Sequence, residues 1–201
     1  MNLTLLLLTA VVPLDLSKLL PMPGDEGASS YYRLEHDERG AFIRSDYRPG
    51  MKTERLALEL PESARAGRHV LHWRWRVNVL PKGGDECVDG KRDSAASVYI
   101  GWRRGLRWYG LKYAWSTAGK RGAICDSKRN PFLVGDAVLL ESGAPVGDWI
   151  EEKVDLESEF RAHFGGDEVP ELQGIAILSD GDATESPASA DFGGFELEVL
   201  Q

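Results

Sequence analysis

Polar and apolar residues alternate almost without fault along residues 69–81. The apolar set is Leu71, Trp73, Trp75, Val77 and Val79, and the polar set between them is His72, Arg74, Arg76 and Asn78. A period of two with aromatic and β-branched residues predicts a strand that is buried on one face and wet on the other. Two indole rings on one face form either a core or an aromatic platform. Apolar runs elsewhere in the chain can cover them, so we expect a core.

Shorter runs of the same kind recur between turn residues along the rest of the chain. They cover residues 31–35, 41–44, 55–60, 97–102, 107–115, 172–178 and 194–199. Residues 138–141 and 149–154 are expected to pair around the turn between them. Residues 155–164 predict the one helix, which Asp155 can cap. The pattern predicts an all-β fold, an antiparallel jelly-roll-like β-sandwich with one short helix.

The 201 residues suffice for one domain, which we place at residues 31–201 after a linker at 21–30. Residues 1–20 contain an apolar run, Leu3–Leu8, that is too short to span a membrane. The run matches the apolar part of a secretory signal peptide, which predicts an exported protein, periplasmic or extracellular. An N-terminal strand or a wrongly assigned start are the alternatives.

Charge and cysteine content narrow the class of protein further. The net charge of -8 argues against a nucleic-acid partner, because such proteins need clustered lysine and arginine. The two cysteines, Cys87 and Cys125, both lie in loop-like segments. In an exported protein they would form one disulfide, and otherwise they are two unrelated thiols.

One loop gathers hard oxygen ligands between the last two predicted strands. Asp180, Asp182, Thr184 and Glu185 lie close together around a glycine. Calcium prefers such ligands, whereas the alternative is a solvated loop whose aspartates bind their own backbone. We expect no other cofactor.

The same loop could instead bind the hydroxyl groups of a sugar. We expect Asp180 and Asp182 to accept hydrogen bonds beside Thr184, with the rings of Tyr113 and Trp115 stacking on the ligand. The alternative is that these rings pack in the core, as aromatic residues at alternate strand positions usually do.

Two other sets of charged residues are weaker candidates for a functional site. The row formed by His72, Arg74 and Arg76 could hold an anion or could pair with acids on the next strand. The glutamates of 151–152 and of 196–198 could serve glycoside hydrolysis, which needs two carboxylates across a cleft. Glutamates at alternate positions are also typical of the solvent face of any strand.

From Trp73 onward the order of segments resembles a bacterial family catalogued as domain of unknown function 3047. The matching pieces are 73–77, 80–81, 97–100, 113–115, 138–143, 149–155, 160–165 and 174–184. The resemblance covers about Tyr31 to the C-terminus and implies an exported jelly-roll sandwich without naming an activity.

These observations together predict an exported, non-catalytic binding module for carbohydrate or a similar polar ligand, without a membrane span. A glycan-cleaving sandwich and a structural envelope protein without a ligand are the alternatives.

Overall fold

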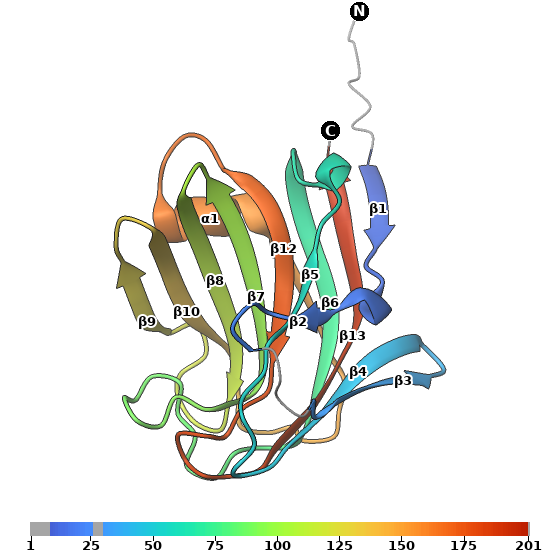
Figure 1. Cartoon of the computed structure of the whole chain (residues 1–201), viewed down its shortest axis with the longest axis vertical. Coiled ribbons are helices and arrows are strands. Elements are labelled where there is room, and N and C mark those ends of the chain that lie inside the picture. Colours follow the sequence, from blue (N-terminus) through green and yellow to red (C-terminus); the bar gives the residue numbers. More distant parts are fainter. Residues whose placement is uncertain (1–8, 26–29, 201) are drawn as a thin grey trace, which may run out of the picture.

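The computed structural model describes residues 9–25 and 30–200, which form two facing β-sheets (Figure 1). Sheet A, on the right in Figure 1, has six strands. In spatial order they are β11 (Ile150–Asp155), β6 (Arg68–Val79), β13 (Ala188–Leu200), β4 (Gly40–Tyr47) and β3 (Tyr32–Asp37), with β1 (Thr9–Pro13) pairing with β13.

Sheet B has seven strands, and its outer face is the surface opposite the core. Its order is β2 (Leu20–Pro21), β5 (Leu56–Glu59), β12 (Glu171–Leu178), β7 (Ser94–Arg104), β8 (Arg107–Ser116), β10 (Leu133–Ser142) and β9 (Ile124–Arg129). The predicted β-sandwich is therefore confirmed, with one departure: β10 runs parallel to β8.

The expected pairing of residues 138–141 with 149–154 is wrong. The first segment belongs to β10 in sheet B, and the second forms β11 in sheet A, where it pairs with β6. The connection between them crosses from one sheet to the other, and local alternation cannot distinguish such a crossing from a hairpin.

The tryptophan strand, β6, supplies the centre of the core. The ring of Trp73 lies 5.6 Å from that of Trp75 and 5.8 Å from that of Tyr113, and Trp75 lies 5.7 Å from Trp115. All four rings are buried, so the two tryptophans of β6 are core residues rather than a platform. Edge-on contacts between such rings add to the stabilisation from burial.

The predicted helix exists as α1 (Leu156–Phe164), and two short 3₁₀ helices occur at Leu16–Lys18 and Glu62–Ala64. Asp155 caps α1 by accepting hydrogen bonds from the backbone N–H groups of Glu157 and Ser158, both at 3.2 Å. Phe160 packs against Trp102 of sheet B. The helix thus closes one end of the sandwich.

Part of the segment expected to be a signal peptide is integrated into the sandwich. Residues 1–8, with the whole apolar run Leu3–Leu8, lie outside the described residues. Strand β1 pairs with the end of β13, and Leu16 and Leu19 are buried in the core. Cleavage of this segment stays a prediction. Within the described residues, no helix is long and apolar enough to cross a membrane.

Candidate functional site

The two predicted stacking rings are unavailable to a ligand at the surface. Tyr113 is 1% exposed and Trp115 is 0% exposed, because both lie on the inner face of β8. The Tyr113 hydroxyl donates to Glu159 of α1 at 2.9 Å, and the Trp115 indole N–H donates to the Gly143 carbonyl oxygen at 2.9 Å. These hydrogen bonds lead away from the 179–186 loop, so the structure does not join the rings to the predicted aspartates.

Tyr113 nevertheless reaches the wall of a cavity of about 450 Å³ between α1, β10 and β11. Its hydroxyl, the carboxylate of Glu159 and the imidazole of His163 line this cavity together with apolar side chains such as Val138 and Leu140. His163 Nδ1 lies 2.9 Å from Asp136. This polar cluster holds α1 against the sheet.

The 179–186 loop is organised by Asp93, a residue that sequence reasoning missed. Asp93 accepts hydrogen bonds from the N–H groups of Ala183 and Thr184 at 3.1 and 2.7 Å, and from the Thr184 hydroxyl. Asp180 accepts from the Ser94 N–H at 3.0 Å, whereas Asp182 is exposed. Asp93 lies about ninety residues before the loop, and no local pattern connects the two.

Three carboxylates of this cluster could hold a cation. Oxygen atoms of Asp93, Asp180 and Asp182 lie within 4.8 Å of one another. The hydrogen bonds that shape the loop already use both oxygens of Asp93. Loop formation therefore accounts for Asp93 without an ion, and calcium binding stays a prediction.

Asp180 belongs to a buried charge cluster at the end of sheet B. Lys112 donates to both carboxylate oxygens of Glu86 at 2.8 Å, and the Ser94 hydroxyl donates to Glu86 at 2.6 Å. Burial raises the pKa of Asp180 to about 7, with help from the charges of Glu86 and Asp93 and against the charge of Lys112. Asp180 therefore titrates near neutral pH.

The outer face of sheet B, opposite the core, leads from this cluster to an exposed tryptophan. Side chains alternate between the two faces along β7 and β8. Ile100 and Tyr113 point into the core, so their chain neighbours Tyr99 and Lys112 face outward. The Lys112 ammonium lies 5.7 Å from the centre of the Tyr99 ring. Trp108 lies further along the same face and is 42% exposed.

Between the pair formed by Tyr99 and Lys112 and the Trp108 ring, four glycines lie side by side on four adjacent strands. The glycine row consists of Gly174 of β12, Gly101 of β7, Gly110 of β8 and Gly135 of β10. A Cβ atom added at Gly110 would meet nothing within 4 Å, and one at Gly101 would meet the Trp108 ring at 3.8 Å. The Trp108 ring thus leans over Gly101, and bare backbone lies between it and Tyr99.

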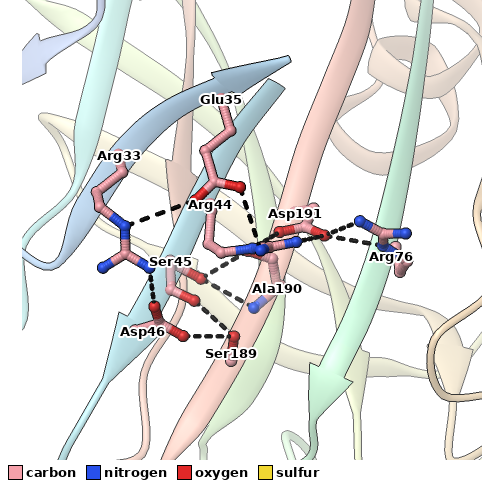
Figure 2. A network of polar contacts seen from close by, with 9 residues as sticks. All are labelled: Arg33, Glu35, Arg44, Ser45, Asp46, Arg76, Ser189, Ala190 and Asp191. Atoms are coloured by element: carbon pink, nitrogen blue, oxygen red, sulfur yellow. Dashed lines mark hydrogen bonds and ion pairs between the residues drawn. The ribbon is translucent and has the colours of Figure 1, made fainter. Parts of the chain in front are cut away.

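Sheet A, in contrast, uses its charged outer face for internal pairing. Figure 2 shows Asp191 between Arg44 and Arg76, which donate to its carboxylate at 2.8 Å from their Nε atoms. Arg74 donates to Asp37 at 2.8 Å and lies over the Trp149 ring. The cationic row of β6 therefore pairs with acids rather than standing free to hold an anion.

The glutamate pairs suggested for catalysis lie apart from the glycine row. Glu152 accepts a hydrogen bond from the Trp75 indole at 3.2 Å, whereas Glu151 is exposed and pairs with Arg39. Glu198 lies near His72 of β6, at 3.4 Å, on the outer face of sheet A. These carboxylates do not face one another across a groove.

Cys87 and Cys125 form a disulfide that joins the 82–93 loop to β9. The disulfide lies at the same end of sheet B as Glu86 and Asp93. The loop it holds in place is therefore the loop that supplies two of the buried acids.

These features define a β-sandwich with an open aromatic and polar strip across one sheet. The chain belongs to the family described as Protein of unknown function (DUF3047), whose model matches residues 23–196. No curated protein matches the chain.

Several solved structures resemble the fold at low sequence identity. The family 30 carbohydrate-binding module of a cellulosomal cellulase of Clostridium thermocellum is 10% identical, with 94% of this chain and 96% of that chain covered and a TM-score of 0.49. The family GH12 endoglucanase 3 of Trichoderma harzianum is 8% identical, with 100% of both chains covered and a TM-score of 0.48. Likenesses this weak say nothing of the ligand of this chain.

Proposed function

We propose that this protein is an exported binding module for carbohydrate or a similar polar ligand, and that the ligand lies on the outer face of sheet B. The observation that carries the proposal is the Trp108 ring, which is half-exposed and leans over the glycine row. A flat aromatic surface beside hydrogen-bonding groups suits the C–H faces and hydroxyl groups of a sugar.

The glycine row adds room for such a ligand. With no side chain at Gly110, a ligand can approach the backbone beside the Trp108 ring, which itself covers Gly101. The Arg103 guanidinium, 5.4 Å from the centre of that ring, lies next to the same strip. The half-buried side chains of Tyr99 and Lys112 border the strip at the opposite side, where the Lys112 ammonium is bound to Glu86. The proposal keeps Asp180 near the site, as an acid close to Lys112 and Tyr99, and replaces the buried rings of Tyr113 and Trp115.

Export is supported by the Cys87–Cys125 disulfide, since disulfides form and persist mainly in oxidising compartments. The apolar N-terminal run is consistent with the same location.

A glycan array with the full chain tests the proposal, followed by titration of any glycan that binds. We expect Trp108→Ala and Gly110→Val each to weaken binding by about tenfold or more, because one removes the ring and the other fills the strip. Leu34→Ala is the matched control, since Leu34 is equally exposed but lies on sheet A. Absence of binding by the wild type, or binding unchanged in both variants, would contradict the proposal.

Catalysis is not part of the proposal. Glu86 and Asp180, which both bind Ser94 and lie on the same side as the glycine row, are buried. Hydrolysis would require both carboxylates to reach the glycosidic oxygen and the sugar ring. Release of reducing sugar by the wild type but not by Asp180→Asn would establish the hydrolase alternative instead.

A further inference from the structure

Two neighbouring turns at the upper end of sheet B in Figure 1 expose large apolar side chains. The turn between β7 and β8 presents Leu106, which is 76% exposed, and the turn between β9 and β10 presents Phe132, which is 65% exposed. We call these turns, residues 103–108 and 130–133, the basic tip. The opposite end of the sheet carries the 179–186 loop.

The two turns form one surface because hydrogen bonds join them. The Trp108 N–H donates to the Phe132 carbonyl oxygen at 2.8 Å. Arg107 Nε donates to the Pro131 carbonyl oxygen at 3.0 Å. Leu106 and Phe132 are therefore held in fixed positions on adjacent turns, with Trp108 and Leu133 beside them.

The arginines of the tip differ from most arginines of the chain. Arg103, Arg104 and Arg107 donate only to carbonyl oxygens, of Gly105, Glu168 and Pro131. Within residues 9–25 and 30–200, no carboxylate lies within ion-pair distance of these three guanidinium groups. Arginines elsewhere, such as those around Asp191, have acidic partners. The exposed Glu171 of β12 is the register partner of Arg103 but forms no ion pair with it, and the Arg103 guanidinium lies 5.4 Å from the centre of the Trp108 ring.

Exposed apolar side chains among arginines that form no ion pair match the surface of an anionic membrane. Arginine binds lipid phosphate groups through paired hydrogen bonds, and its charge is attracted by the negative surface potential. Leucine and phenylalanine can enter the boundary between headgroups and acyl chains, where tryptophan is also favoured. A sugar chain would use the arginines and Trp108 but would leave Leu106 and Phe132 in water.

We propose that the basic tip docks this protein on membranes that contain anionic phospholipid, through Arg103, Arg104 and Arg107 at the headgroups and Leu106 and Phe132 at the acyl boundary. The docking is peripheral, and it leaves the 179–186 loop, at the opposite end of the sheet, directed away from the lipid. It does not depend on the proposed carbohydrate binding, which uses different residues except for Trp108.

Sedimentation of the full chain with vesicles tests the docking. Vesicles of phosphatidylcholine with added phosphatidylglycerol should bind the protein at low salt, and pure phosphatidylcholine vesicles should not. The double variants Arg104→Gln/Arg107→Gln and Leu106→Ser/Phe132→Ser should each lower the partition coefficient by about tenfold or more. Raised salt should weaken the wild type because it screens the arginines.

The matched controls make the same kinds of substitution at exposed residues outside the basic tip. Arg48→Gln/Lys120→Gln removes two exposed charges at the other end of the molecule, and Leu20→Ser removes an exposed leucine of β2. Neither should change vesicle binding, and all variants should unfold at the temperature of the wild type.

Three results would overturn the proposal. The first is the same vesicle binding by wild type and both tip variants, or none by the wild type. The second is a wild-type dimer in sedimentation velocity that Leu106→Ser/Phe132→Ser dissociates, which assigns the tip to a second copy. The third is arginine-dependent binding to polygalacturonate, heparin or RNA without vesicle binding, which assigns the tip to a soluble polyanion.

Discussion

Asp191 shows how single residues of this sandwich combine burial with charge. Its carboxylate is fully buried and receives hydrogen bonds from Arg44 and Arg76, on the strands to either side (Figure 2). Burial alone would raise the pKa of Asp191, but the two guanidinium groups lower it below its ordinary value. Its contribution to stability is therefore present above the ordinary pKa of aspartate and is lost as the pH falls through the lowered value.

We predict that Asp191→Asn lowers the free energy of unfolding by about 2–4 kcal/mol at neutral pH, because two arginines lose their buried partner. Denaturant unfolding measures the change. Asp46→Asn, at a more exposed carboxylate of the same network, should cost less than about 1 kcal/mol. Equal effects of both substitutions would show that the burial of Asp191 has no special role.

Glu152 has the opposite dependence on pH. Burial and the neighbouring Glu141 raise the pKa of Glu152 to about 7, against the effects of the Trp75 indole and Arg121. The folded protein thus holds an extra proton between the ordinary pKa of glutamate and neutrality. Stability should fall as the pH rises through that window.

Glu152→Gln removes this titration, and its amide oxygen can still accept the Trp75 hydrogen bond. We expect the variant to exceed the wild type in unfolding free energy by about 1–3 kcal/mol at about pH 8, and by much less at about pH 5. Glu151→Gln, at an exposed neighbour, should leave the pH dependence unchanged. If the unfolding free energy of the variant depended on pH as steeply as that of the wild type, the titrating group would be another residue.

At the scale of the strands, two positions of the glycine row differ in the space that a side chain would have. A Cβ atom at Gly174 would lie 2.3 Å from the Leu58 carbonyl oxygen, whereas one at Gly110 would meet nothing within 4 Å. We predict that Gly174→Ala destabilises the protein by about 2–3 kcal/mol by forcing β5 from β12. Gly110→Ala should change stability by less than about 0.5 kcal/mol. Thermal unfolding of both variants makes the comparison, and similar midpoints would contradict it.

Strand alternation predicted the sandwich and the tryptophan core because each strand has one buried face. It could not tell which face of β8 would meet the core. Tyr113 and Trp115 lie on the inner face, whereas Trp108 and Lys112 lie on the outer one. The glycine row and the contact between Asp93 and Thr184 depend on the register of distant strands and loops. Neither leaves a signal in a single local window.

At the scale of the whole molecule, the disulfide links the 82–93 loop, which supplies Glu86 and Asp93, to the edge of sheet B. Cys87 and Cys125 are 38 residues apart in sequence, and they hold the 82–93 loop against β9. On the chain-entropy model, such a crosslink stabilises the folded state by about 3–4 kcal/mol. We predict that Cys87→Ser/Cys125→Ser loses a comparable amount in denaturant unfolding. A reductant should destabilise the wild type equally and leave the double variant unchanged, and any other outcome would place the stabilisation outside the crosslink.

The N-terminal segment links the fold to the question of export. Strand β13 lies at the centre of sheet A, and its last residues pair with β1 on the side that β4 leaves free. Leu16 and Leu19 fill the core beside it. Removal of residues 1–20 would expose an unpaired strand edge and apolar surface, which favours aggregation.

We therefore expect the chain without residues 1–20 to unfold at a clearly lower temperature than the full chain and to aggregate. A chain without residues 1–8 keeps β1, Leu16 and Leu19 and serves as the reference, because the expected effect comes from the loss of these elements. Calorimetry and light scattering on the three chains, with mass spectrometry of the secreted protein, separate the alternatives. A stable shortest chain whose mass matches the secreted form would show that a cleaved leader, rather than a structural strand, occupies this segment.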